Sequence, residues 1–318
     1  MQKANTKVWL IGAGGMALDY AKVLDALELD YSVIGRGEKS ASKFESLSHA
    51  RVIRGGLENR QRGSTVPDCA IIAVGVEALG PVTCRALEHG IRRILVEKPA
   101  GLNLEEVSRV NELALAFGAE IYVAYNRRFY GSVLTAQKII RDDGGVSSFA
   151  FEFTEFSHEI ETLKKAPGVK EAWVLGNSSH VLDLAFHLGG VPEDIYAVRT
   201  GGLSWHPSGS VFAGAGRVRG GALFSYHANW ESAGRWGLEL CTPKRRLIFR
   251  PMEQLQVMPK GSVSVEAVDI IDADIDKKFK PGLIKQVEAF IFGNGRNELC
   301  GISEHLERLP IYVRIAGY

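Results

Sequence analysis

A glycine-rich turn between a short apolar strand and a helix constrains the fold of this chain more than any other feature. Residues 8–11 are apolar, and Gly12-Ala13-Gly14-Gly15-Met16-Ala17 follows them directly. Gly12 permits a tight turn, Gly14 lets a pyrophosphate approach the backbone, and Ala17 allows close helix–strand packing. This unit predicts a dinucleotide site that Gly12, Ala13, Gly14, Gly15 and Met16 line, with the pyrophosphate at the helix N-terminus. The alternative is a plain glycine turn.

Strand-like and helix-like segments alternate over the first third of the chain. The run 70–74 is apolar throughout, which is typical of a parallel strand buried on both faces. We expect strands at 8–11, 31–34, 70–74, 94–96 and 121–124, and helices at 16–29, 81–89 and 104–117. This β-α-β alternation predicts an α/β fold with a doubly wound parallel sheet.

The pattern changes near residue 145. Phe149, Phe151 and Phe153 alternate with smaller or polar residues, which is the period of a strand with two different faces. Further strands are expected at 195–200, 210–218, 222–228, 237–241 and 246–249, and helices at 178–188, 283–292 and 303–315. We therefore predict two domains: a nucleotide-binding domain over 1–124, and an α+β domain with a mostly antiparallel open sheet over 125–318.

Composition excludes several functional classes. The chain has 318 residues, which suggests about two domains. Its formal net charge of +1, from 38 basic and 37 acidic residues, gives no bias toward nucleic acid or an anionic membrane. No apolar run approaches the roughly 18 residues that span a bilayer, and the N-terminus shows no signal peptide. The four cysteines form no Cys-x-x-Cys pair, so we expect a cytoplasmic protein.

The end of the second strand predicts which dinucleotide binds. An acidic residue there would accept a hydrogen bond from the ribose 2′-hydroxyl of NAD, but this strand ends in Gly35-Arg36-Gly37, and Glu38 comes later. Arg36 is suited to a 2′-phosphate, so NADP is favoured. Alternatively, Arg36 stacks on the adenine and NAD binds as well. Val74, at the end of the run 70–74, is expected to line the same site.

Glu97-Lys98-Pro99 follows the apolar strand 94–96. Open α/β sheets bind ligands at the carboxyl ends of their strands, where Lys98 is expected. The proline disfavours a helical conformation for Lys98. Lys98 is therefore expected to face the cofactor and to give or take a proton, although a solvated surface lysine is the alternative. Glu97 either contacts the nicotinamide side or forms a structural ion pair.

These motifs together resemble those of a known family. Gly12-x-Gly14-x-x-Ala17, Glu97-Lys98-Pro99 and Tyr125-Asn126-Arg127-Arg128-Phe129 look like the signature of the Gfo/Idh/MocA oxidoreductases, and the resemblance extends over essentially the whole chain. It implies a Rossmann domain followed by an open-sheet domain, through which members commonly form homo-oligomers. It also implies NAD(P)-dependent hydride transfer to or from a sugar or cyclitol, often a nucleotide-linked one.

The resemblance also implies roles for individual residues. Lys98 corresponds to the active-site lysine of the family, which hydrogen-bonds the reacting oxygen. The segment from Tyr125 to Arg128 would line the junction of the two domains. Tyr125 and Arg128 are candidates to bind substrate, although an interdomain ion pair explains Arg128 equally well.

The helix expected at 178–188 carries the second candidate proton-transfer group. His180, Asp183 and His187 share one helical face, and Asn177 or Ser178 is suited to cap the helix. By resemblance, His180 is the family's general acid/base or binds the reacting hydroxyl. A buried structural histidine is the alternative. Asp183 is expected to orient His180 or to bind substrate hydroxyls, and no metal site is expected.

One position departs from the family pattern and leaves the substrate open. Many sugar and inositol dehydrogenases of the family carry an aspartate four residues before the histidine, where this chain has Gly176. We expect a hydride-transferring enzyme that acts on a carbohydrate, and a nucleotide-linked sugar or keto-sugar is favoured. The alternatives are a reductase of a non-sugar carbonyl or imine, and a non-catalytic NADP-binding sensor. The intact Lys98 and His180 argue against the sensor.

Overall fold

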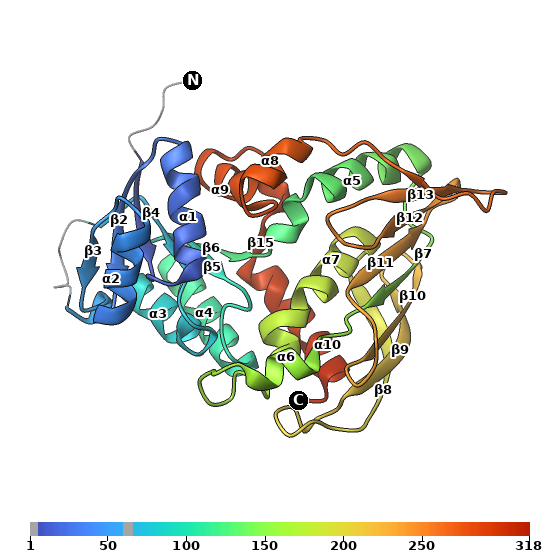
Figure 1. The fold of residues 1–318 in the computed structure, drawn as a ribbon, viewed down its shortest axis with the longest axis horizontal. Helices are drawn as coiled ribbons and strands as arrows, with labels where there is room; N and C mark the ends of the chain where they lie inside the picture. The colour runs from blue at the N-terminus through green and yellow to red at the C-terminus, as the bar shows by residue number, and fades with distance from the viewer. Residues whose placement is uncertain (1–5, 60–65) are drawn as a thin grey trace. The chain divides into compact units, whose positions relative to one another are not determined.

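The structure is a computed structural model that describes residues 6–59 and 66–318 (Figure 1). The chain forms two compact units. The first contains the residues up to Tyr125 together with Leu283–Glu307, and the second contains Asn126–Gly282 and Arg308–Tyr318. The predicted C-terminal domain, 125–318, includes 283–307, whereas the structure packs this segment with the first unit. Periodicity predicts that a segment is helical, but it does not tell which sheet the helix packs on.

The first unit is built on a seven-stranded sheet with the strand order β15-β6-β5-β4-β1-β2-β3. All neighbouring pairs are parallel except β15, which runs antiparallel to β6. Because the carboxyl ends of parallel strands share one edge, the turns after β1, β4 and β5 lie at the same edge. The strands are β1 (Lys7–Ile11), β2 (Asp30–Gly35), β3 (Val52–Arg54), β4 (Cys69–Ile72), β5 (Arg93–Glu97), β6 (Glu120–Ala124) and β15 (Cys300–Gly301).

The helices of the first unit follow local sequence signals with two exceptions. At the N-terminus of α4, the Asn103 side chain accepts a hydrogen bond from the Glu106 backbone N–H at 2.9 Å, and left-handed Gly118 ends the helix as predicted. Helix α3 begins earlier than predicted and contains Pro81. Helix α2 was not predicted, because only Ala41 and Phe44 on it are buried. The helices are α1 (Gly15–Ala26), α2 (Glu38–Leu47), α3 (Val76–Glu88), α4 (Leu104–Phe117) and α9 (Leu283–Phe292), with short 3-10 turns η1 (Leu57–Asn59) and η4 (Arg296–Glu298).

The second unit is built on an eight-stranded sheet with the order β14-β13-β12-β11-β7-β10-β9-β8. The predicted antiparallel arrangement is confirmed for every neighbouring pair except β7 and β10, which are parallel. The strands are β7 (Ser148–Glu152), β8 (Pro192–Thr200), β9 (Val211–Val218), β10 (Leu223–Asn229), β11 (Gly237–Cys241), β12 (Arg245–Phe249), β13 (Gln256–Pro259) and β14 (Glu266–Ala267).

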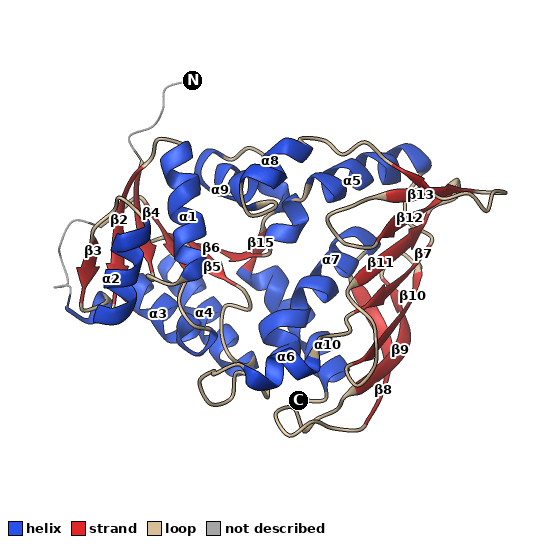
Figure 2. Ribbon diagram, viewed as in Figure 1, coloured by secondary structure: helices blue, strands red, loops and turns tan. Residues whose placement is uncertain are grey.

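Helices cover one face of this sheet (Figure 2). Helix α7 packs on β7 and β11, and α5 packs on β12. Phe186 of α7 meets Phe149, Phe151 and Phe224 of the sheet, with ring centroids 5.1–6.1 Å apart. The helices are α5 (Gly131–Asp143), α6 (Ser157–Thr162), α7 (Ser179–Gly189) and α8 (Ala273–Lys278), with the 3-10 turn η2 (Asn126–Phe129) and the π-helical turn η3 (Val174–Ser178); α10 (Ile302–Ala316) begins in the first unit and ends in the second.

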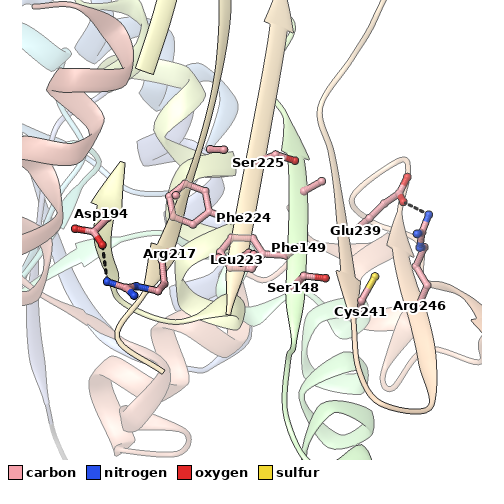
Figure 3. Close-up of a pocket in the computed structure, with 13 residues that line it drawn as sticks. Ser148, Phe149, Asp194, Arg217, Leu223, Phe224, Ser225, Glu239, Cys241 and Arg246 are labelled. Carbon is pink, nitrogen blue, oxygen red and sulfur yellow. Dashed lines mark hydrogen bonds and ion pairs between the residues drawn. The ribbon is translucent and has the colours of Figure 1, made fainter. Parts of the chain in front are cut away.

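The other face of the second sheet carries exposed side chains. Along β10, Phe224 and Tyr226 are buried, whereas Leu223 is 61% exposed. On β8, Tyr196 and Val198 are exposed. A hollow of about 750 Å³ lies over β7, β9, β10 and β11. The ion pairs Asp194–Arg217 and Glu239–Arg246 flank it (Figure 3). Within the described residues, every helix is too short or too polar to cross a bilayer.

Candidate active site

The glycine-rich turn lines a pocket of about 490 Å³ in the first unit, between the ends of β1, β2 and β4 and the start of α1. Seven residues predicted to bind cofactor line this pocket: Gly12, Ala13, Gly14, Gly15, Met16, Arg36 and Val74. Glu97 and Lys98 were also predicted to contact the cofactor, and they are not among its lining residues.

Positions 12 and 14 of the motif are glycine for different physical reasons. Gly12 has a φ of 127°, and a Cβ on it would overlap the carbonyl oxygen of Ala73, so the turn itself requires glycine. At Gly14, by contrast, no atom of the described residues beyond the adjoining backbone lies within 4 Å of an added Cβ. The fold therefore tolerates a side chain at position 14, and the open space there fits a pyrophosphate at the N-terminus of α1.

The ribose end of the pocket is lined by Arg36, which has no ion pair among the described residues. Glu38 is held away by Arg54, whose Nε donates to its carboxylate at 2.7 Å and lowers the pKa of Glu38. Glu58 also lines the pocket, and it pairs with Arg85 at 3.2 Å. The carboxylates of Glu38 and Glu58 thus have basic partners, and Arg36 is the basic side chain among the residues that line the pocket.

Lys98 lies half-buried in a tight turn after β5. The Ala100 backbone N–H closes this turn by donating to the Glu97 carbonyl at 3.0 Å, and the Lys98–Pro99 peptide bond is cis. The phenol of Tyr20 donates to the Glu97 carboxylate at 2.8 Å, and burial together with that carboxylate raises the pKa of Tyr20. Glu97 therefore contacts a neutral phenol of α1, a partner that the sequence analysis did not consider.

A buried histidine fixes the other side of the same turn. His305 is fully buried, and its Nε2 lies 3.0 Å from the carbonyl oxygen of Pro99. Its Nδ1 lies 3.5 Å from the phenol oxygen of Tyr125. Tyr125, predicted to bind substrate, is 1% exposed. The geometry favours a role in positioning, because Tyr125 and His305 support the turn that carries Lys98.

His180 lies in the first turn of α7 in the second unit and is 7% exposed. Its ring lies 6.2 Å from that of Trp236, measured between centroids. The predicted capping by Asn177 or Ser178 is wrong, because the π-helical turn η3 continues directly into α7. Both side chains instead donate to the Glu155 carboxylate, at 2.9 and 2.7 Å.

Glu155 is a functional candidate that the sequence analysis missed. It is 3% exposed, and besides Asn177 and Ser178 it accepts a hydrogen bond from the Arg235 guanidinium at 3.1 Å. Burial raises the pKa of Glu155 although these donors act in the opposite direction. Its side chain thus joins the end of β7 to the turn that precedes His180. Its position just after the alternating strand gave no local signal of this role.

Arg128 and Asp183 form a buried ion pair. Each side chain is 1% exposed, and two hydrogen bonds of 2.8 and 2.6 Å join the guanidinium to both carboxylate oxygens. Arg308 approaches the same carboxylate at 3.5 Å. Burial alone raises the pKa of Asp183, but the two arginines outweigh it and hold this pKa below its usual range. The pair lies wholly within the second unit. Its geometry favours a positioning role for Arg128 over substrate contact.

The face of α7 shows no metal site. His187, one turn beyond Asp183, has its Nε2 3.1 Å from the Gln137 amide nitrogen. Within the described residues, no group of three histidine, cysteine or carboxylate side chains is arranged to hold a metal ion.

Comparison with known proteins identifies the first unit. Residues 6–125 match the Gfo/Idh/MocA group, described as an oxidoreductase family with an NAD-binding Rossmann fold. Residues 6–125 are therefore similar to the NAD-binding domain of this family. The match agrees with the motifs in this part of the sequence, which predict NAD(P)-dependent hydride transfer.

A curated oxidoreductase is also similar to part of this chain. An uncharacterized oxidoreductase, C115.03, of Schizosaccharomyces pombe (strain 972 / ATCC 24843) is 28% identical over 134 residues, which are 41% of this chain and 36% of that protein. The aligned region thus spans about a third of that relative's length.

Solved structures share the whole fold. A putative NADPH-dependent oxidoreductase from Desulfitobacterium hafniense DCB-2 superposes with a TM-score of 0.80 at 18% identity, covering 99% of this chain and 95% of that one. The UDP-N-acetylglucosamine 3-dehydrogenase GnnA from Acidithiobacillus ferrooxidans gives a TM-score of 0.72 at 17% identity, covering 98% and 96%. These likenesses confirm the two-part architecture of a Rossmann unit and an open-sheet unit.

Packing does not force glycine at position 176, where the resemblance implied an aspartate. At Gly176, the nearest atom to an added Cβ is the Val169 carbonyl oxygen, at 4.0 Å. The backbone here therefore has room for the first carbon of an aspartate. The local fold does not explain why this chain carries glycine.

Proposed function

We propose that the protein is an NAD(P)-dependent dehydrogenase or reductase of a carbohydrate. The observation that carries this proposal is the pocket at the N-terminus of α1, which seven predicted cofactor-binding residues line and in which Gly14 leaves open space. A bound nicotinamide cofactor would donate or accept the hydride. Family membership of residues 6–125 supports this reading.

The proton of the reaction is assigned to Lys98 and His180. The hydrogen bonds of Glu97, Pro99 and Ala100 hold the turn that carries Lys98, so its ammonium group is presented from a fixed backbone. His180 lies on α7, which the Arg128–Asp183 pair anchors to η2. A cation that donates a hydrogen bond to the reacting oxygen stabilises the charge that develops as the hydride transfers.

The favoured substrate is a nucleotide-linked sugar or keto-sugar. The supporting observations are the sugar-nucleotide dehydrogenase among the structures with the same fold and the absence of an aspartate at position 176. A substrate held at a distance by a nucleotide depends less on hydroxyl contacts near His180, because binding energy from remote groups helps to orient the reacting carbon.

NADP is the favoured cofactor, and NAD is the alternative. Arg36 lines the ribose end of the pocket, and the carboxylates nearest to that end are paired with Arg54 and Arg85. A guanidinium matches the geometry of a phosphate and has no such preference for a hydroxyl.

We further propose that two copies associate through the exposed face of the second sheet. Tyr196, Val198 and Leu223 are large apolar side chains on this face, and burying them would be favourable. Light scattering on the intact protein, compared with a Tyr196→Lys variant, tests this. A monomeric wild-type protein would contradict it.

A fluorescence titration with NADPH and NADH in parallel tests the proposed function. We expect NADPH to bind more tightly, and Arg36→Ala to remove that preference. Lys98→Ala should retain cofactor binding while turnover in a sugar-nucleotide screen is lost. If neither cofactor binds to protein shown to be free of copurified nucleotide, the oxidoreductase proposal fails. Tighter binding of NADH would contradict the Arg36 argument alone.

A further inference from the structure

Two neighbouring arginines in η2 differ sharply in how their charges are satisfied. Arg128 is bound to both carboxylate oxygens of Asp183. Arg127 has no ion pair among the described residues, and its Nε is buried without a hydrogen-bond acceptor. Burial lowers the pKa of Arg127, which reflects a cation that the surrounding protein does not compensate well. The arginine with capacity for a ligand is therefore Arg127.

Arg127 belongs to a cluster that is rich in hydrogen-bond donors. Its guanidinium lies 4.7 Å from the ring centroid of Trp236, and that of Arg235 lies 4.5 Å from the same ring. Trp236 is 6% exposed, and its indole N–H also has no acceptor in the part of the chain that the structure describes. The His180 ring lies beside this indole, 6.2 Å away. Two buried N–H groups without acceptors in one cluster are unusual, because native structures satisfy nearly all such groups.

The carboxylates near this cluster do not bind the unused N–H donors of Arg127 and Trp236. Glu155 binds Arg235 through one oxygen, and its other oxygen accepts from Asn177 and Ser178. Glu253 is exposed and interacts with the phenol of Tyr130. Burial is the main cause that raises the pKa of Tyr130 to about 12, so this phenol stays protonated. Arg235 is about half exposed, so part of its guanidinium remains accessible. The cluster thus combines accessible positive charge with unused donors, next to His180.

We propose that Arg127, Arg235 and Trp236 form a subsite for an anionic group on the substrate, a carboxylate or a phosphate. This proposal rests on the proposed function and narrows it to acidic or phosphorylated carbohydrates, which include nucleotide-linked ones. The planar guanidinium groups would bind the anion by charge-assisted hydrogen bonds, and the indole would hold both side chains in place. The subsite lies within the second unit and needs no residue of the first.

Calorimetric titration of the full chain with three probes at constant ionic strength tests the proposal. The probes are glucuronate, glucose 6-phosphate and neutral glucose, each titrated with and without NADPH. We expect at least one anionic probe to bind about 10-fold or more tightly than glucose, the effect of one or two charge-assisted hydrogen bonds. The tighter of the two anionic probes tells whether carboxylate or phosphate is the preferred group.

Three variants assign that difference to the cluster. Arg127→Met should weaken binding of the anionic probe by about 10-fold or more and leave glucose unchanged, and Arg127→Lys should retain part of the preference because it keeps the charge. Arg92→Met is the matched control. Arg92 lies 4.7 Å from the Phe117 ring, but its guanidinium is satisfied by the Leu87 and Ile91 carbonyls.

The outcomes separate this proposal from the proposed function. Equal binding of charged and neutral probes by the wild-type protein, or no binding of any probe, overturns the subsite whatever the variants do. An anion preference that survives in both Arg127 variants also overturns it. The titration with NADPH reports the cofactor site separately, so a protein that binds the anion without the cofactor keeps the subsite and loses the dehydrogenase.

Discussion

Removing the Arg128 guanidinium is expected to destabilise the second unit strongly. Arg128→Met keeps much of the side-chain volume but removes the partner of the Asp183 carboxylate, which is 1% exposed. Arg308, at 3.5 Å, is then the arginine that still approaches this carboxylate. Breaking a buried pair by removing one partner costs about 3–5 kcal/mol, because the remaining charge stays desolvated. Arg308 offsets part of this cost, so we expect a loss near the lower limit.

Urea unfolding followed by circular dichroism measures this loss. Lys277→Met is the matched control, because Lys277 and Asp274 form a pair of 3.1 Å that is 77% and 95% exposed. Such exposed pairs contribute about 0–1 kcal/mol. If Arg128→Met lowers the free energy of unfolding no more than the control does, the buried pair does not hold α7 to η2 and the argument is refuted.

The pH dependence of the stability of the same variant provides a second test. The pKa of Asp183 is lowered in the folded protein, so the pair contributes its full stability above the ordinary carboxyl pKa. That contribution is lost as the pH falls through the lowered value. The difference between wild-type and Arg128→Met stability should therefore shrink in acid. A difference that grows as the pH falls would contradict the assigned sign.

Three further substitutions test other parts of the structure. Gly12→Ala should lower the thermal stability of the first unit, because the new Cβ overlaps the Ala73 carbonyl. Gly14→Ala should keep wild-type stability in thermal unfolding but weaken NADPH binding by about 10-fold or more in a fluorescence titration. Equal stability losses in the two variants would contradict this reading. Burial raises the pKa of Glu155, so wild-type stability should decline as the pH rises from the ordinary glutamate pKa toward the raised one. Glu155→Gln should flatten that part of the pH profile of the melting temperature. An unchanged profile would argue against a raised pKa for Glu155. Gly176→Ala should fold with little change in melting temperature, since the nearest atom to the new Cβ, the Val169 carbonyl oxygen, is 4.0 Å away, and a large loss of stability would show that the glycine is structural.

The nucleotide-binding unit could be predicted well from the sequence because its signals are local. An apolar run, a glycine turn and a helix within residues 7–26 define β1, the pocket edge and α1. Gly12 itself records a steric requirement of the turn. The order of segments along the chain then predicts a parallel sheet, since β-α-β units close in one way.

The site in the second unit could be predicted only in part. The helical face that carries His180 and Asp183 follows from spacing, and its burial follows from the apolar residues beside it. The cap predicted for that helix was wrong, because a π-helical turn precedes it and Glu155 takes both capping side chains. The partner of Asp183, Arg128, lies 55 residues away in the sequence, so no local pattern relates the two.

The sequence by itself determined most of the secondary structure, the fold class and the glycine-lined pocket of the first unit. These depend on interactions between residues a few positions apart: apolar periodicity, the sterics of glycine and the capping of helix ends. Only the tertiary structure decided that Arg128 is neutralised by Asp183 while Arg127 and Trp236 retain unused donors, and that 283–307 packs with the first unit. The physical reason is that charge compensation and burial depend on which distant segments meet, and two adjacent arginines look identical until their partners are in place.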